Sequence, residues 1–491
     1  MFRDESTKVM QKAHAQWGTS DSATEEGSER SSPSDQNSWA VFLGPSPTSM
    51  ALSSNGLAMT RIPRRVEPNL DQRGIQFFVE RYLLNHPDSP NTPALRDAYM
   101  GDGDAIQNVM IAVGLAGMSN LLGNKSMNLV ARSKYITALK QTGQLIASAT
   151  RDPKAVNKPL MSIVTLALFE VVQGKGSKVT AGSANTHING AVALARSALP
   201  VAGAPDGGAR GVLQLMFSML IPSQMTETPL PPGFFECLKL CKKLLSSTAE
   251  DFIVDIAALI ARLIHLLLSI TQTAHVDDQP PTDSMIQQLL LANSGLDHYE
   301  GLMICAFPFV VHQFEQPSPA IFRGKWHKYE DIWGARIWNH LRWARLLLAN
   351  KLVEIMAKYP MSSARFISPK RTAQFYTKIE RTAKDLLRST PSHWHHPALE
   401  DATAKRMAAA GKGGAGAAGL PTLLWHLVIA GCAPNVPPDF WDWGHECLQV
   451  VWRSMGMQHA VALSEVMEEH RKTLQETGAS NAAVIQGVLA T

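Results

Sequence analysis

Cysteines and histidines are the residues of this sequence that could bind a metal or act as nucleophiles and bases. The five cysteines are Cys237, Cys241, Cys305, Cys432 and Cys447. The Cys237-x3-Cys241 spacing puts two thiols one turn apart on one helical face, where they could contribute to a metal site. A binuclear zinc cluster needs six cysteines in two C-x2-C-x6-C units, and this sequence contains no C-x2-C pair. The cysteines therefore cannot form that cluster, and their low, odd number indicates reduced thiols in the cytosol or nucleus.

Three histidines lie close together in S-H-W-H-H-P, at His393, His395 and His396. We expect this segment to be a loop, and no cysteine or carboxylate stands at a diagnostic metal-ligand spacing from it. In H-E-C at 445–447 the side chains are adjacent in sequence, so they radiate around a helix and do not converge. The sequence also lacks GxSxG, HExxH, P-loop and dinucleotide motifs. We therefore expect no catalytic residue, no cofactor and no metal site in this chain.

Composition is that of a soluble globular protein. The 491 residues are 45% hydrophobic, with a mean hydropathy of -0.07. The net charge of +4 arises from 46 Lys+Arg and 42 Asp+Glu, too weak a bias to indicate a nucleic-acid surface. The first residues are charged and lack the apolar region of a secretory signal. The most apolar run, 252–270, contains Asp255, Arg262 and His265, so we expect a core helix and no membrane contact.

The longest regular pattern runs from Asp331 to Met356. Apolar residues recur there at steps of three and four, so one stripe of a long helix is expected to be buried. This stripe contains Ile337, Leu341, Ala344, Leu348, Leu352 and Ile355. Arg336, His340, Asn350 and Lys351 fall largely off the stripe, so we expect a half-buried helix. Trp333, Trp338 and Trp343 each need a partner for the indole N–H if they are buried.

The same spacing dominates from 71 to 474, and no period-two pattern persists. The fold class is therefore predicted as all-α, a large domain of a dozen or more helices packed as antiparallel neighbours. The other expected helices span 71–84, 106–122, 127–149, 160–174, 187–196, 211–220, 234–245, 249–270, 284–293, 369–389, 419–431, 439–454 and 457–474. Ser247 and Glu250 form a capping box for the helix at 249–270.

The N-terminal region differs in composition. Ser20 to Ser38 has five acidic residues and seven serines, and no aromatic or branched apolar residue. Such a segment cannot bury enough apolar surface to fold, so 20–65 is predicted as a disordered linker. Arg61, Arg64 and Arg65 could contact a nuclear-import receptor or nucleic acid, although three arginines beside a linker are more often simply solvated.

The amino-acid identities in the long helix are more informative about function than its apolar spacing. A-R-I-W-N-H-L-R-W-A-R-L-L-L at 335–348 resembles the W-N-x-Y-R-x-x-R-L-x-L helix of the fungal-specific transcription factor domain, the regulatory region of fungal regulators that carry a binuclear zinc cluster. The matching residues are Trp338, Asn339, Arg342 and Arg345. The segment at 71–84 resembles the opening helix of the same domain. The resemblance implies a structural role for these residues and assigns them no chemistry.

Two further phrases resemble this domain. H-I-N-G-A-V-A-L-A-R at 187–196 matches at His187, Gly190 and Ala191, although the tryptophan usual before the histidine and the closing glycine are absent. A histidine at a helix start is more often a capping or packing residue than a ligand. G-L-P-T-L-L-W-H-L-V-I-A-G at 419–431 matches at Trp425 and Gly431, with His426 where proline is common. The resemblance therefore covers about 71–474.

The first residues also carry a resemblance. M-F-R-D-E-S-T-K-V is similar to the segment that follows the sixth cysteine of a zinc cluster in many of these regulators. We therefore expect the chain to start just downstream of such a cluster, through a misplaced start codon or loss of the cluster. The resemblance then divides the chain into a short polar segment at 1–19, the linker at 20–65 and the regulatory domain at 66–491.

The resemblance implies a nuclear transcriptional regulator that controls a pathway or secondary-metabolite gene set. DNA would be contacted only through the missing upstream zinc cluster, the only implied use of zinc. The implied partners are other transcription regulators or a second copy in a homodimer. The alternative is a cluster-free helical scaffold or adaptor, and an all-α enzyme is a further possibility. Six in-frame cysteine codons upstream of Met1 would favour the regulator, and an upstream stop codon would favour the scaffold.

Overall fold

The structure of the protein, a computed structural model, describes most of the chain from Asn69 onward, and these residues belong to one compact unit. The described ranges are 69–83, 104–149, 156–174, 176–202, 206–246, 250–277, 280–409 and 419–477. The predicted polar segment 1–19, the predicted linker 20–65 and Ser247 of the predicted capping box lie outside these ranges.

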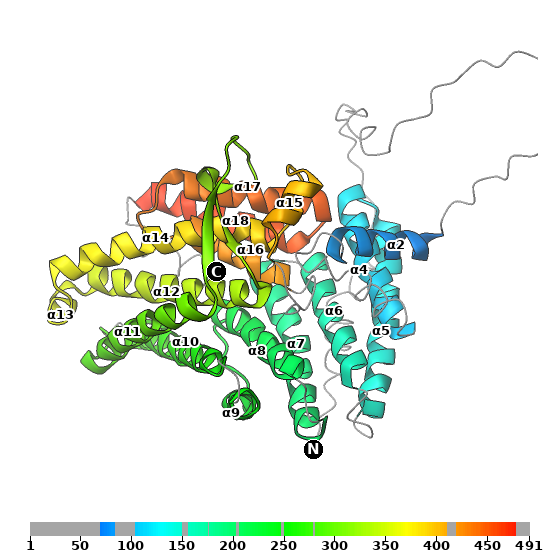
Figure 1. Ribbon diagram of the computed structural model, residues 1–491, viewed down its shortest axis with the longest axis horizontal. Helices are drawn as coiled ribbons and strands as arrows, with labels where there is room; N and C mark the ends of the chain where they lie inside the picture. The colour runs from blue at the N-terminus through cyan, green and yellow to red at the C-terminus, as the bar shows by residue number, and fades with distance from the viewer. Residues whose placement is uncertain are drawn as a thin grey trace, which may run out of the picture. The chain divides into compact units, whose positions relative to one another are not determined.

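Helices make up nearly all the regular structure of the described residues, which confirms the all-α prediction (Figure 1). The first helices are α2 (Leu70–Phe78), the π-helical turn η1 (Val79–Leu83), α4 (Asp104–Leu122), α5 (Lys125–Ala149), α6 (Asn157–Gln173), α7 (Ser177–Ala202), α8 (Asp206–Met225) and α9 (Phe234–Leu245). The next are α10 (Phe252–Asp277), α11 (Asp283–Ala306), α12 (Ile332–Lys358), α13 (Pro360–Ser363), α14 (Pro369–His393), α15 (Asp401–Met407), α16 (Gly419–Gly431), α17 (Pro438–Met455) and α18 (Gln458–Thr477).

Helices α2 and α4 are in direct backbone contact. Asn69 and Gln72 form a capping box that starts α2, with hydrogen bonds of 3.0 and 2.8 Å. Helix α2 then crosses α4 where Gly74 meets Gly114, and a Cβ atom built on Gly114 would lie 1.9 Å from the Gly74 carbonyl oxygen. This crossing therefore requires glycine, because the two backbones are in direct contact.

The sequence pattern predicts no strand, and this is wrong at one place. β1 (Phe309–Gln313) and β2 (Lys325–Tyr329) form a two-stranded antiparallel sheet. Helix α11 ends just before Pro308, because proline has no N–H to donate and disfavours helical conformation in the preceding residue. The strands have five residues each, too short for a period-two pattern to stand out among helices.

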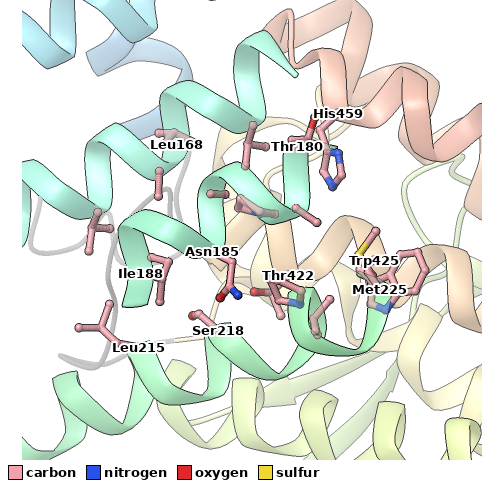
Figure 2. A pocket seen from close by; sticks show the side chains of 18 of the residues that line it. Leu168, Thr180, Asn185, Ile188, Leu215, Ser218, Met225, Thr422, Trp425 and His459 are labelled. Atoms are coloured by element: carbon pink, nitrogen blue, oxygen red, sulfur yellow. The ribbon is translucent and has the colours of Figure 1, made fainter. Parts of the chain in front are cut away.

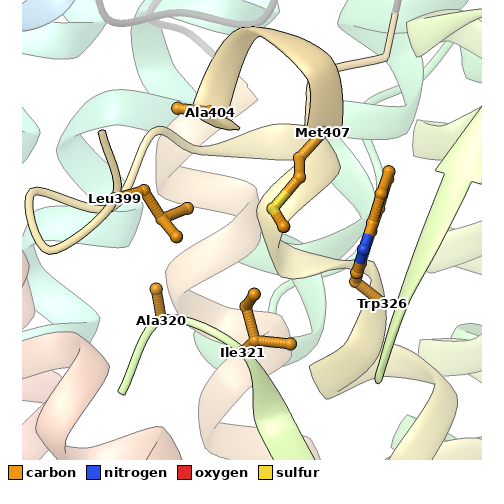
Figure 3. Close-up of a cluster of buried hydrophobic side chains, with 6 residues drawn as sticks. All are labelled: Ala320, Ile321, Trp326, Leu399, Ala404 and Met407. Atoms are coloured by element: carbon orange, nitrogen blue, oxygen red, sulfur yellow. The ribbon is translucent and has the colours of Figure 1, made fainter. Parts of the chain in front are cut away.

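A small apolar cluster attaches this hairpin to the chain around α15. Figure 3 shows side chains from the hairpin loop and β2 facing others from α15 and the segment before it. Its buried members are Ala320, Ile321, Trp326, Leu399, Ala404 and Met407. The hairpin is thus part of the folded core, although β1 itself is mostly exposed.

Helix α12 confirms the predicted long helix but not its half-buried character. Asp331 caps it by accepting a hydrogen bond from the Trp333 N–H (2.9 Å). Helices α10, α11, α14 and α16 all contact α12, which lies among them in Figure 1. Every residue from Ile332 to Val353 is buried. The polar residues expected off the stripe are buried too, with exposed fractions of 6% at Arg336, 1% at His340, 8% at Asn350 and 2% at Lys351.

Helix α7 begins ten residues earlier than expected, so the prediction of a helix start at His187 is wrong. Gly176, with φ at 88°, precedes the first turn at Ser177. The intervening Ser, Thr and Asn residues are weak helix formers in isolation, but here they pack against α6 and α8. Helix α8 likewise continues through Pro222 to Met225, beyond the predicted end at 220.

Two of the described helices are long and apolar enough to span a membrane by length and composition alone. They are Asp104–Leu122 and Phe252–Thr273, and 67% and 56% of their most apolar windows are buried inside the protein. Core helices of soluble proteins pass the same test, so this is weak evidence for a membrane span. The absence of membrane contact stays a prediction.

Candidate functional site

Three of the α12 residues that match the fungal transcription factor domain, Trp338, Asn339 and Arg342, lie together near the start of this helix. The Trp338 indole N–H donates to the Phe307 carbonyl oxygen (2.8 Å), at the junction of α11 and the hairpin. The Arg342 guanidinium donates to the Tyr329 hydroxyl (2.6 Å) and to Asn339 Oδ1 (3.3 Å). These hydrogen bonds satisfy buried polar groups and attach the hairpin to α12.

Aromatic rings surround the Arg342 guanidinium. Its central carbon lies 5.1 Å from the Phe309 ring centre, 5.0 Å from that of Trp338 and 6.0 Å from that of Tyr329. Arg342 is 5% exposed. Ring faces attract a guanidinium electrostatically, and the attraction is stronger where water is excluded. The rings and the neutral oxygen acceptors thus stabilise a buried positive charge.

Asn339 connects α12 to α14. Its Oδ1 atom accepts a hydrogen bond from the Ser389 hydroxyl (2.8 Å), and its Nδ2 atom lies 3.0 Å from His393 Nε2. Ser392, in the last turn of α14, donates to the His327 carbonyl oxygen of β2. The start of α12, the end of α14 and β2 are therefore joined by one hydrogen-bonded network.

His327 and Asp385 lie beside this network. His327 Nε2 is 3.5 Å from Asp385 Oδ1. Burial, with the positive charges of Arg342 and Arg388, lowers the pKa of His327 to about 2, and burial raises the pKa of Asp385. His327 is therefore a neutral imidazole at pH 7 and does not form a charged pair with Asp385.

Arg345, the fourth residue of the phrase, contacts two carboxylates of α11. Its guanidinium donates to Asp297 (2.7 Å) and Glu300 (2.8 Å). Lys378 and Arg381 of α14 donate to the same two carboxylates. Burial alone would raise the pKa of Asp297, but hydrogen bonds from Lys378 and Arg345 hold it below its usual range. The cluster joins α11, α12 and α14 through charge-assisted hydrogen bonds.

A cavity of about 200 Å³ lies between these two clusters. Its ionisable lining residues are Glu300, Arg342, Arg345, Arg381 and Asp385. An active site requires ionisable side chains that converge on one cavity in this way. Here, however, most of these groups are engaged: Arg345 and Arg381 bind Glu300, and Arg342 donates within the network above. Thr382 is the only hydroxyl-bearing side chain in the lining, and no cysteine lines it. The arrangement is that of a structural charge network and carries no positive case for catalysis.

His187 belongs to a separate polar cluster. Its Nε2 atom lies 2.9 Å from the Tyr135 hydroxyl and 3.5 Å from a Glu170 carboxylate oxygen, and the Tyr135 hydroxyl donates to Glu170. Burial and the Glu170 carboxylate raise the pKa of Tyr135, so its hydroxyl remains a donor. His187 therefore joins α7 to α5 and α6. Sequence reasoning gave no indication of Tyr135.

Three of the four remaining family-like residues, Ala191, Trp425 and Gly431, are used for packing, and Gly190 is exposed. Ala191 is fully buried, whereas a Cβ atom on Gly190 would meet nothing within 4 Å. Trp425 of α16 is 1% exposed. A Cβ atom on Gly431 would lie 3.3 Å from the Phe440 carbonyl oxygen, so glycine permits the close approach of α16 and α17 there. The nine residues therefore lie in separate clusters and do not form one site.

The histidines of S-H-W-H-H-P have different partners. His393 contacts Asn339, His395 lies 3.6 Å from Asp401, and the His396 ring accepts from the Ala398 N–H (3.1 Å). Among the described residues, no group of three His, Cys, Asp or Glu side chains could hold a metal ion.

The other motifs also diverge or are buried. In H-E-C, His445 pairs with Glu468 and Glu446 with Arg453, while Cys447 is buried, so the predicted divergence is confirmed. Cys237 and Cys241 are both buried on α9. Their mutual hydrogen bond lowers the pKa of Cys237, and together with burial it raises the pKa of Cys241. Cys241 therefore stays a protonated thiol, which is a poor metal ligand and nucleophile.

Comparison with known proteins gives one informative similarity. The chain is 30% identical to Transcription factor dbaG of Emericella nidulans over 152 residues, which are 30% of this chain and 34% of that protein. The match thus spans about a third of the relative's length. No protein-family model matches the sequence. No solved structure matches it either. The chain is therefore similar to a fungal transcription factor over about a third of its length.

Proposed function

We propose that this protein is a transcriptional regulator, and that its helical unit is the regulatory module of a fungal zinc-cluster-type transcription factor. The observation that carries the proposal is the similarity to Transcription factor dbaG. The family-like phrases add support, because Trp338, Asn339, Arg342 and Arg345 lie in the most deeply buried helix and hold its neighbours in place. On this proposal the protein acts in the nucleus on a pathway or secondary-metabolite gene set.

On this proposal, DNA is contacted only through a binuclear zinc cluster of the kind that the resembled family carries. Partners are other transcription regulators or a second copy of this chain. A cluster-free scaffold that binds other regulators remains the second candidate function. The scaffold function predicts that the protein associates with other regulators and that its loss has no immediate effect on transcription.

Rapid depletion distinguishes these functions. We expect that degrading the full-length chain through an inducible degron will change the nascent RNA of a limited gene set within minutes, before secondary effects accumulate. An untagged strain treated with the same inducer is the control. If no nascent transcript changes while the protein is fully depleted, the regulator proposal is wrong and the scaffold function is favoured.

A further inference from the structure

A second cavity, of about 70 Å³, lies between three consecutive helices and two helices from near the C-terminal end of the described residues. Side chains of α6, α7, α8, α16 and α18 line it, as Figure 2 shows. Most of the lining is apolar, with Leu168, Ile188, Leu215 and Met225 as large members. Ligand sites in proteins have this character: mostly apolar walls with a few polar groups that fix orientation.

Four polar side chains in the lining are at least nine-tenths buried and have an atom without a hydrogen-bond partner. These atoms are Thr180 Oγ1, Gln214 Oε1, Trp425 Nε1 and His459 Nδ1, and their residues are 2%, 5%, 1% and 4% exposed. Leaving a buried polar atom unsatisfied costs about 1–3 kcal/mol. These atoms are therefore available to donate to, or accept from, a molecule bound in the cavity.

The lining sets the charge of that molecule. It contains no Lys, Arg, Asp or Glu. Burial lowers the pKa of His459 to about 4, so this histidine is neutral at pH 7. An ion would lose its hydration here without gaining an opposite charge, which is strongly unfavourable. The occupant must therefore be neutral.

The volume of the cavity and the polar atoms in its lining determine the chemical class of the bound molecule. A water-sized group occupies about 10–15 Å³ of cavity volume. The cavity of about 70 Å³ therefore has room for about five to seven such groups. Gln214 Oε1 can only accept a hydrogen bond and Trp425 Nε1 can only donate one, so the occupant needs both functions. We propose that this cavity binds a small, neutral, largely apolar molecule that carries a hydroxyl group.

Gln214 also lines a third, much smaller cavity of about 10 Å³, together with Asn339, His340 and His426. Its side chain therefore stands between the proposed ligand and the buried centre of α12. A molecule that hydrogen-bonds Gln214 would act directly on a side chain adjacent to the Asn339 network.

Phenol is a suitable probe, because its ring is apolar and its hydroxyl both donates and accepts. We expect the purified full-length chain to bind phenol saturably at one site in isothermal titration calorimetry. Benzoate, which has a similar shape and a negative charge, should not bind. Because this measurement requires no transcription, its failure would leave the proposed function untouched, and the reverse is also true.

Filling the cavity supplies the control. Ala184 lines it from α7, whereas Ala193, nine residues along the same helix, lies on the opposite face and does not. Ala184→Leu should weaken phenol binding at least tenfold, and Ala193→Leu should leave it unchanged. Ser218→Leu, from α8, is a second filling variant for the case that Ala184→Leu does not fold.

Two results would overturn the proposal. One is the absence of saturable phenol binding to the folded wild-type chain. The other is phenol binding that survives in a folded cavity-filling variant or that benzoate reproduces with similar affinity, since either would place the binding elsewhere.

Discussion

Lowering the pH from about 7 to about 5.5 is expected to remove about 6 kcal/mol of the free energy of unfolding. The cause is a set of five buried histidines. Burial lowers the pKa of His327 to about 2, of His340 to about 3, and of His396 and His459 to about 4, and it also lowers the pKa of His426. These rings stay neutral in the folded protein, whereas in the unfolded chain they bind protons below about pH 6.5.

The direction of this change in the free energy of unfolding follows from the number of protons that each state binds. Between pH 6.5 and the lowered values near 2 to 4, the unfolded chain binds more protons than the folded one, so the free energy of unfolding falls as the pH falls. Each histidine contributes about 1.2 kcal/mol over the stated interval. Since domains are typically stable by about 5–15 kcal/mol, this loss is a large share of the free energy of unfolding.

Urea unfolding of the full-length chain at a series of pH values measures this effect. His340→Phe should reduce the slope of unfolding free energy against pH by about one proton, or about 1.4 kcal/mol per pH unit. His340 already stacks on Phe217, with ring centres 4.8 Å apart, so a phenyl ring suits the site. The same substitution at exposed His298 is the matched control. A wild-type slope below one proton between pH 6.5 and 5.5 would contradict the neutral burial of these rings.

Gly114→Ala is expected to destabilise the protein by about 3 kcal/mol. The added Cβ atom would lie 1.9 Å from the Gly74 carbonyl oxygen and 2.7 Å from the Gly74 carbonyl carbon. These are backbone atoms of α2, so no side-chain rotation relieves the clash and α2 must move away from α4. The measurement is the free energy of unfolding in urea.

Gly143→Ala is the control of opposite sign. Gly143 lies inside α5, and a Cβ atom there would meet nothing within 4 Å. Alanine is the better helix former, so this variant should be more stable by about 0.5–1 kcal/mol. Equal effects of the two substitutions would mean that α2 does not contact α4 as described.

The spacing of apolar residues was enough to predict the helical class and most helix positions. Helix α12 was predicted within two residues at each end, because Asp331 and Pro360 mark its limits and its apolar stripe is continuous. The same reasoning failed where packing overrides local preference. The segment from Ser177 to Thr186 is rich in weak helix formers, yet α6 and α8 hold it as helix.

Burial of polar residues could not be predicted from one helix alone. His340 and Lys351 lie off the apolar stripe of α12, and their burial depends on which helices cover the other faces. The partners of Arg345 are equally remote, since Asp297 and Glu300 are 48 and 45 residues away. Their i,i+3 spacing on one face of α11 was the one local sign that they could act together.

The residues that carry the resemblance acquire a physical meaning from the structure. Arg342 is held by three rings and by Tyr329, and Asn339 joins α12 to α14. The cavity lined by Gln214 and Trp425 was not foreseen, because it is assembled from five separate helices.

Tethering the full-length chain to a promoter tests the central claim, that this protein regulates transcription, most directly. The chain would be fused to a heterologous DNA-binding domain and measured on a reporter that carries its operator, against the DNA-binding domain alone. The account predicts a reproducible, several-fold change in reporter RNA, upward or downward. Reporter RNA equal to that of the DNA-binding domain alone, with the fusion folded and bound at the operator, would contradict it.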